Sequence, residues 1–166
     1  MNGERIIPQI PGLRRYARLL TRDPHRADDL VQDTLLRACA KWTLWRPDSD
    51  LRAWLFTIMH NLFINQVRAA PPVSAQLDDM LEAGHTEDPS VGIDLERALA
   101  RLPDDQREVL LMVTVEDFSY AEVARVTGVP VGTVMSRLSR GRRRLRDAME
   151  GTREAAEPRS HLKVMK

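Results

Sequence analysis

The 166-residue sequence contains one cysteine, Cys39, and this scarcity excludes a disulfide framework and a cysteine-based zinc site. The four histidines are scattered and form no metal-ligand spacing with that cysteine, which we expect to be a small buried residue of a helix. A glycine-rich phosphate-binding loop is also missing. We therefore expect a protein that is not an enzyme and that uses no cofactor or metal.

Long hydrophobic runs and aromatic residues are also rare. The longest apolar run, Val109 to Val115, is far too short to cross a bilayer. The first twelve residues, MNGERIIPQIPG, do not have the pattern of a signal peptide. We expect a cytoplasmic protein with no membrane insertion. Aromatic residues make up 5% of the chain and hydrophobic residues 43%, which favours an all-α fold with small helical cores.

The net charge of +1 conceals a strong division along the chain. Residues 1–70 contain eleven basic and seven acidic residues, and residues 123–150 contain seven basic and two acidic ones. Residues 71–90 contain five acidic residues and no basic one, and 91–122 contain eight acidic and three basic residues. This division indicates separate surfaces for separate partners, and the basic parts suit nucleic acid. Because 71–90 is acidic, begins with two prolines and lacks periodicity, we interpret it as a flexible linker with at most one helical turn, around residues 75–81.

Residues 117–149 are the most informative stretch and predict two helices joined by a tight turn. Ser119 can cap the first helix, and Glu122 three residues later completes a capping box. Gly128 ends that helix, and Val134 lies in the apolar stripe of the second. This pattern is typical of a helix-turn-helix.

The second of these helices has six arginines within ten residues, namely Arg137, Arg140, Arg142, Arg143, Arg144 and Arg146. A DNA-recognition helix uses such charge because phosphate contacts supply much of the affinity and arginine forks can read guanine edges. A solvated charged face is the alternative interpretation. The turn just before the helix favours DNA binding.

The first 70 residues predict three helices, at about 8–21, 24–42 and 51–68, with Asp23-Pro24 as a start signal for the second. The expected buried stripe of the second helix consists of Ala27, Leu30, Val31, Leu35 and Ala38, and that of the third consists of Leu51, Trp54, Leu55, Ile58 and Leu62. A polar stripe of Asn61, Asn65 and Arg68 lies on another face of the third helix. Such side chains can hydrogen-bond unpaired bases. On the residues alone, an ordinary solvated face explains the stripe more simply.

Three segments, in this order and at this spacing, resemble the extracytoplasmic-function sigma factors, the small two-domain group of the sigma-70 family. They are ADDLVQDTLLRA (27–38), LRAWLFTIMHNLFIN (51–65) and LPDDQREVLLMVTVEDFSYAEVARVTGVPVGTVMSRLSRGRRRL (102–145). The resemblance covers about residues 8–150 and implies two small helical domains. These are a sigma-2-like domain of three to four helices over 1–70 and a sigma-4-like helix-turn-helix domain over 91–150, joined by the acidic linker 71–90 and followed by a disordered tail over 151–166.

The resemblance also implies a function and partners. An alternative sigma factor binds core RNA polymerase at its clamp helices and flap, recognises the −35 and −10 promoter elements, and promotes DNA melting by capturing flipped bases rather than by catalysis. Such proteins are usually held inactive by an anti-sigma factor. The segment RPDSDLRAWLFTIMHN is similar to members that run general stress responses, so we expect a stress or envelope-type regulon.

The family roles carry over to residues of this sequence. The resemblance places Asp29, Gln32, Asp33 and Leu36 against the polymerase, and His60, Asn61, Asn65 and Arg68 at the −10 element. It places Thr133, Met135, Ser136, Arg137, Ser139, Arg140, Arg143 and Arg144 at the −35 element. Within that set, Ser136 and Arg140 are the expected base contacts, and the arginines from Arg142 onward are expected to neutralise phosphates.

Two alternatives from other classes remain at this point. A helix-turn-helix regulator could bind an operator without polymerase, but this alternative assigns no function to the acidic face of Asp29, Gln32 and Asp33 or to the Asn61/Asn65 stripe. It would also call for a symmetric dimer, for which the sequence has no heptads. A DNA-processing enzyme such as a recombinase would need a nucleophile or metal carboxylates, and the acidic residues of the first domain instead lie along an amphipathic helix.

Overall fold

The computed structural model describes residues 2–70 and 89–156, and within those residues it contains helices and no strand. The first part comprises α1 (Asn2–Ile6), η1 (Ile7–Gln9, a 3-10 helix), α2 (Ile10–Thr21), α3 (Pro24–Ala40), η2 (Trp42–Leu44, a 3-10 helix) and α4 (Leu51–Ala69). The second part comprises α5 (Pro89–Ala100), α6 (Asp104–Thr114), α7 (Tyr120–Thr127) and α8 (Val131–Ala156). The predicted all-α class is confirmed.

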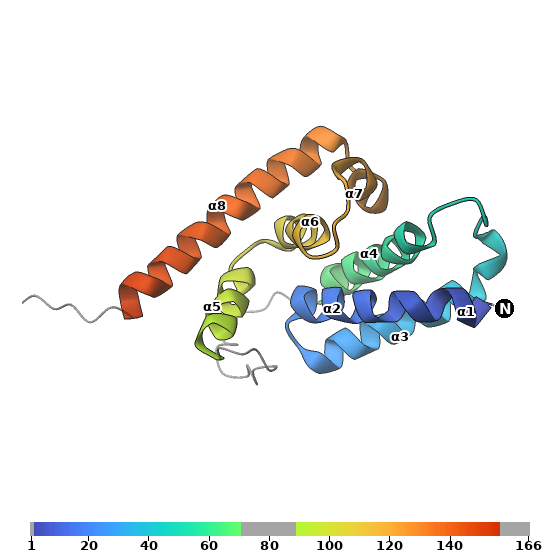
Figure 1. Ribbon diagram of the computed structural model, residues 1–166, viewed down its shortest axis with the longest axis horizontal. Helices are drawn as coiled ribbons and strands as arrows, with labels where there is room; N and C mark the ends of the chain where they lie inside the picture. The colour runs from blue at the N-terminus through green and yellow to red at the C-terminus, as the bar shows by residue number, and fades with distance from the viewer. Residues whose placement is uncertain (1, 71–88, 157–166) are drawn as a thin grey trace, which may run out of the picture.

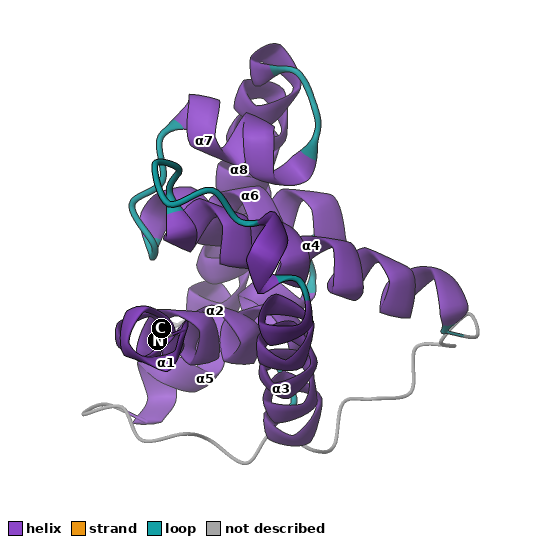
Figure 2. Cartoon of the chain, turned by 90° about the vertical axis from the view of Figure 1, so that its right-hand side faces the viewer, coloured by secondary structure: helices purple, strands orange, loops and turns teal. Residues whose placement is uncertain are grey.

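The two sets of helices pack against each other. Helices α2, α3 and α4 form a bundle, and α8 runs along α5, α6 and α7 at the opposite side of the molecule (Figure 1). Helix α6 contacts α2, and α7 contacts α4, so α6 and α7 form the layer between α8 and the first bundle. Figure 2 shows the same layering after a quarter turn, with α7 and α8 above α6 and with α2 and α3 below it.

Aspartate caps fix where α3 and α4 begin. The side chain of Asp23 accepts hydrogen bonds from the backbone N–H groups of His25 (2.9 Å) and Arg26 (3.3 Å), and Pro24 occupies the first helical position. Asp50 caps α4 in the same manner. These caps satisfy backbone donors that have no partner inside the helix. The predicted starts of both helices are therefore confirmed.

The helix-turn-helix forms as the sequence predicts. Ser119 Oγ accepts from the Glu122 N–H at 3.1 Å, and the Glu122 carboxylate accepts from the Ser119 N–H at 2.7 Å, which completes the capping box. Gly128 ends α7 with φ of 72°, a left-handed conformation that a residue without Cβ adopts at little cost. Helix α8 then begins at Val131.

The hydrophobic core is continuous between the two sets of helices. The ring of Phe56 on α4 lies 5.1 Å from that of Tyr16 and 4.9 Å from that of Phe118, measured between centroids. The set of α4 residues predicted to be buried is therefore incomplete. Leu55 and Ile58 are buried as predicted, but Phe56, Met59, His60 and Phe63 are buried too, because the C-terminal helices cover a second side of α4.

Two boundaries differ from the sequence interpretation. Helix α5 already includes Pro89 and Ser90, the last two residues of the expected linker. Helix α8 continues to Ala156 and so includes the first six residues of the expected tail, 151–156; the first proline after its start is Pro158. The helical turn expected around 75–81 lies outside the described residues.

Two further expectations concern the burial of Cys39 and the presence of a membrane-spanning helix. Cys39 is exposed, so the expectation of a buried cysteine is wrong; its neighbour Ala38 takes the buried position of α3. In the part of the chain that the structure describes, no helix has the length and apolar character needed to cross a bilayer.

Candidate nucleic-acid and polymerase interface

The first turns of α8 present one exposed face to solvent. Val134 and Leu138 are buried against the other helices, so the helix is held with its opposite side outward. The exposed side carries Met135, Ser136, Ser139, Arg140, Arg143 and Arg144. Six of the eight residues predicted to meet the −35 element are therefore brought together on one accessible surface.

The remaining two predicted −35 residues, Thr133 and Arg137, are half-buried. The Nε of Arg137 lies 3.4 Å from Oδ2 of Asp105 on α6. The Thr133 carbonyl accepts a hydrogen bond from Ser136 Oγ at 3.0 Å. Arg137 thus holds α8 against α6 in this conformation.

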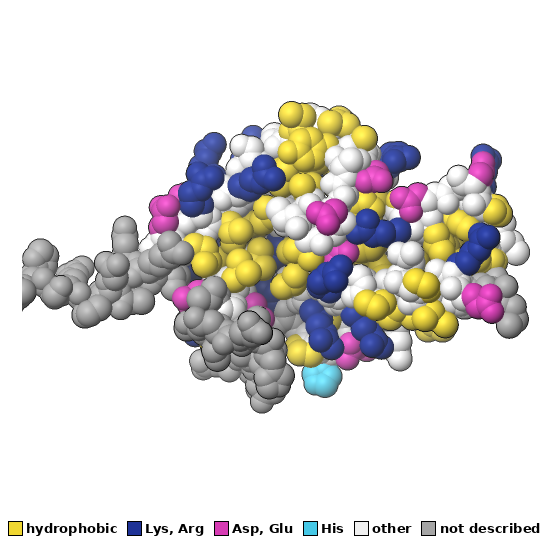
Figure 3. All heavy atoms as spheres, in the orientation of Figure 1, with side chains coloured by type: hydrophobic (Ala, Val, Ile, Leu, Met, Phe, Trp, Pro, Cys, Tyr) yellow, Lys and Arg dark blue, Asp and Glu magenta, His cyan; other side chains and the backbone are white. Residues whose placement is uncertain are grey.

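An open groove of about 450 Å³ runs beside this face, between the start of α7 and the middle of α8. Tyr120, Met135 and Ser139 line one part of it, and Arg142, Arg143 and Arg146 line the other. Three guanidinium groups in one groove create a positive potential that attracts phosphate oxygens. In Figure 3, basic side chains are visible along the α8 side of the molecule, next to an apolar surface near α7.

The predicted −10 residues divide into two groups on α4. Asn61, Asn65 and Arg68 are exposed and form the polar stripe that the spacing predicts. His60 is only 9% exposed, and its Nδ1 lies 2.7 Å from Oε1 of Glu108 on α6. In the packed conformation, therefore, the imidazole of His60 faces the C-terminal helices rather than solvent.

The predicted polymerase residues lie together on the outer face of α3. Asp29, Gln32, Asp33 and Leu36 are all exposed, and Leu36 is 69% accessible. Of the expected buried stripe, four residues are buried and Leu35 is half-buried, while Thr34 joins the core by donating a hydrogen bond to the Leu30 carbonyl. The result is an acidic surface with an apolar side chain within it.

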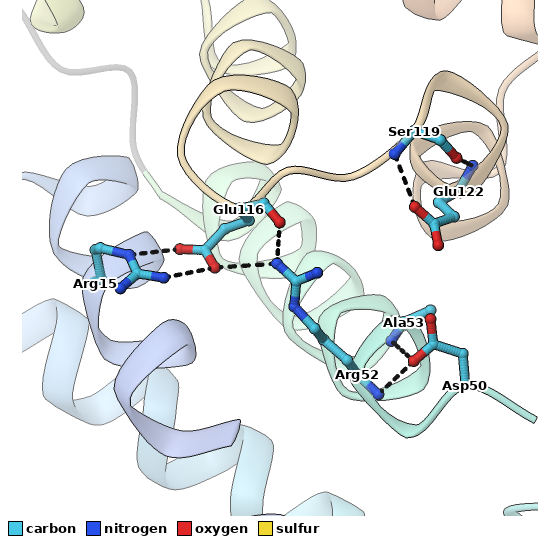
Figure 4. A network of polar contacts seen from close by, with 7 residues as sticks. All are labelled: Arg15, Asp50, Arg52, Ala53, Glu116, Ser119 and Glu122. Carbon is cyan, nitrogen blue, oxygen red and sulfur yellow. Dashed lines mark hydrogen bonds and ion pairs between the residues drawn. The ribbon is translucent and has the colours of Figure 1, made fainter. Parts of the chain in front are cut away.

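Glu116, in the segment between α6 and α7, connects the second set of helices to the first. Its carboxylate accepts hydrogen bonds from Arg15 on α2, both at 3.0 Å, and from Arg52 on α4 at 3.3 Å (Figure 4). Arg52 also donates to the Glu116 carbonyl, and its guanidinium lies 4.1 Å from the centroid of Phe118. The hydrogen bond to Glu116 raises the pKa of Arg15.

Comparisons with known proteins identify the family. The family model described as the sigma2 domain of PhyR matches residues 6–60, and that for sigma-70 region 4 matches residues 93–145. The chain is 41% identical over 145 residues to the ECF RNA polymerase sigma factor EcfG of Rhodopseudomonas palustris, which covers 84% of this chain and 80% of that protein. This chain belongs to the ECF sigma factors.

Further relatives agree. The sigma factor is 38% identical over 135 residues to SigM of Mycobacterium tuberculosis, covering 80% of this chain and 69% of SigM. Its structure is similar to that of RpoE from Bartonella quintana, solved in complex with the anti-sigma factor NepR, with a TM-score of 0.72 and 33% identity. That match covers 89% of this chain and 95% of RpoE. The chain is thus an alternative sigma factor, a transcription initiation factor, and sigma factors are not enzymes in the catalytic sense.

Sequence reasoning missed the polar contacts that join the two halves of this sigma factor. The side chain of Glu108, on α6, is 2% exposed and pairs with His60 on α4. Burial raises the pKa of Glu108, while the hydrogen bond from His60 opposes that rise. Nothing in the local sequence marks these two residues as partners, because they are 48 positions apart.

Arg107 adds another connection between the halves. It is 4% exposed, and its Nε donates to the Leu20 carbonyl at the end of α2, at 3.0 Å. Its other nitrogens donate to the Leu102 carbonyl at 3.1 Å and to the carboxylate of Asp104. A buried guanidinium whose donors have partners is stable inside a protein, so α6 is fixed to α2 by polar as well as apolar contacts.

Proposed function

We propose that this sigma factor binds core RNA polymerase through α3, reads the −10 element with α4 and reads the −35 element with α8. The observation that supports this division is that the predicted residues are largely exposed on three different helices. Each surface also has suitable chemistry: acidic and apolar on α3, amide-rich on α4, and basic on α8. The protein would then melt promoter DNA by capturing unpaired bases, without catalysing a reaction.

At the −35 element, the exposed face of α8 would enter the major groove. Ser136 and Arg140 would contact base edges, because they lie on the first three turns and are accessible. Arg143 and Arg144 lie further along the helix and would contact phosphates. Within the described residues, none of these three arginines forms an ion pair with the rest of the chain, so all three guanidinium groups are available to DNA.

At the −10 element, Asn61, Asn65 and Arg68 would hydrogen-bond unpaired bases and backbone. A role for His60 there has a structural requirement. Because Glu108 holds the imidazole in the layer between the two sets of helices, α6 must move away from α4 before His60 can reach DNA. The packed conformation would therefore open during promoter binding.

The polymerase contact would combine charge with apolar burial. Asp29 and Asp33 would meet a basic surface of the clamp helices, while Gln32 would hydrogen-bond and Leu36 would be buried. A solved relative, RpoE of Bartonella quintana, is bound to the anti-sigma factor NepR. We infer that an anti-sigma factor also binds this chain and competes with its polymerase and promoter contacts.

Charge reversal on α3 tests the assignment. Asp33→Arg should abolish binding to purified core RNA polymerase in a fluorescence titration, yet leave the affinity of the full chain for duplex DNA unchanged. Glu4→Arg, which reverses an exposed carboxylate on α1, is the matched control and should bind core polymerase normally. Core affinity that survives Asp33→Arg would overturn the proposed polymerase surface.

A further inference from the structure

Large apolar side chains are exposed together where α8 begins. Met135 is 51% exposed and Val131, one turn earlier on the same face, is 41% exposed. Tyr120, at the start of α7, is 37% exposed and lines the same groove as Met135. A single exposed apolar residue needs no explanation, but three neighbours on a predicted recognition surface indicate contact with an apolar group of a partner.

Small residues lie next to Val131 and Met135, the apolar pair on α8. Gly132, Ser136 and Ser139 lie on the exposed face with Val131 and Met135. A Cβ added to Gly132 would have no neighbour within 4 Å, so nothing inside the protein requires a glycine at that helical position. Small side chains allow the helix backbone to approach another surface closely, and Met135 would then project furthest from it.

The arrangement of the arginines indicates DNA rather than an apolar protein as that surface. The groove beside Met135 is lined by Arg142, Arg143 and Arg146. These arginines would contact the phosphates of a DNA duplex whose bases meet the apolar pair. In the first three turns, however, Arg137 is paired with Asp105, which leaves only Arg140 to present a guanidinium fork. Much of this reading face therefore has no strong hydrogen-bonding group.

The apolar feature of the DNA major groove is the C5-methyl group of thymine. We propose that Met135, with Val131 beside it, recognises a thymine of the −35 element through that methyl group. This inference rests on the proposed function, in which α8 enters the major groove at the −35 element. It assigns the exposed thioether of Met135 a specificity role in addition to the polar contacts of Ser136 and Arg140.

Replacing thymine with uracil tests the proposal directly, because uracil has the same hydrogen-bonding edge and lacks only the methyl group. Each thymine of the −35 element, on either strand, would be replaced singly in a promoter duplex, and the affinity of the holoenzyme measured for each. At one position the wild-type holoenzyme should lose about fourfold in affinity, the factor expected from one buried methyl group. If no substitution of uracil for thymine lowers the affinity, the proposal is wrong.

Two variants identify the residue responsible. Met135→Ala should fold, because Met135 is exposed on a helix and alanine is a strong helix former. It should bind the thymine and uracil duplexes equally. Ile7→Ala, which truncates another exposed apolar side chain, on η1, should retain the wild-type discrimination. If Met135→Ala keeps the fourfold discrimination, the proposal is wrong.

The same experiment separates this inference from the proposed function. If binding and initiation depend on the −35 base sequence but never on a thymine methyl, only the assignment of Met135 fails. If the holoenzyme shows no dependence on the −35 sequence, α8 does not read that element and the proposed function fails with it.

Discussion

The Nδ1 atom of His60 lies 2.7 Å from Oε1 of Glu108, and this buried pair joins the predicted −10 helix to the C-terminal domain. One residue expected to serve promoter recognition thus participates in the packing of the free protein. Arg107 and Glu116 reinforce the same interface. His60 can therefore reach promoter DNA only when this interface between the two sets of helices opens.

Glu108 should give the folded protein a specific pH dependence. Burial raises its pKa above the ordinary value of 4.5, while facing groups act in both directions: His60 and Arg107 lower it and Asp104 raises it. A raised carboxyl pKa means that the folded state holds the proton more tightly than the unfolded state. The stability of wild type relative to Glu108→Gln should therefore be greatest below pH 4.5 and fall as the pH rises through the raised pKa.

Urea unfolding of both proteins across this pH range measures the difference. Glu150→Gln, which neutralises an exposed carboxylate on α8, provides the control and should show no such fall relative to wild type. A difference between wild type and Glu108→Gln that stays constant, or that increases with pH, would contradict the raised pKa.

Glu116 should stabilise the packing of the two halves. Glu116→Gln would retain the shape of the side chain but remove the charge that Arg15 and Arg52 share. We expect a loss of about 1–3 kcal/mol in the free energy of unfolding, because a hydrogen-bonded buried carboxylate is replaced by a poorer acceptor. The neighbouring Asp117 is exposed, and its left-handed φ of 56° suits asparagine, so Asp117→Asn should change stability little. If Glu116→Gln also changed the free energy of unfolding little, the Glu116 contacts would contribute nothing to stability.

Opening of the packed conformation should be visible by energy transfer. One dye would be placed on Cys39, which is exposed on α3, and a second on the variant Arg125→Cys on α7. Transfer between these dyes should fall when the holoenzyme binds promoter DNA, because His60 must be uncovered. The control pair, Cys39 with Arg14→Cys on α2, lies within one bundle and should not change. Unchanged transfer between α3 and α7 in a complex active in transcription would contradict opening.

Two arginines of α8 should respond differently to truncation. Arg140→Ala should weaken holoenzyme binding by about 1–3 kcal/mol and relax the preference for bases at one position of the −35 element. Arg144→Ala should weaken binding about equally on all sequences and lower the salt slope by roughly one. Affinity measured on a set of −35 variants at several salt concentrations distinguishes the two. Sequence-independent losses from both would contradict the base contact assigned to Arg140.

Local signals explain why much of the fold could be predicted from the sequence. The caps at Asp23 and Ser119 and the turn at Gly128 depend on residues within four positions of each other, and each forms as predicted. The polar stripe on α4 and the outer face of α3 follow from helical periodicity alone. The basic face of α8 is exposed for the same reason.

The interface between the halves could not be predicted, because its partners are distant in sequence and ordinary in composition. Glu116 and Arg15 are 101 positions apart, and no local pattern marks either for the other. The pairing of Arg137 with Asp105 could not be predicted for the same reason, since six arginines within ten residues give no indication of which one faces another helix. Burial of His60 follows from that packing and from no property of α4 itself.

In vitro transcription tests the central claim, that this protein directs promoter-specific initiation. Core RNA polymerase would be incubated with a fragmented genomic library, with and without the protein. We predict discrete transcripts that require both components, with two separated sequence elements upstream of their start sites. No transcripts, while the protein alone still bound duplex DNA at specific sites, would contradict promoter-specific initiation and indicate an operator-binding regulator.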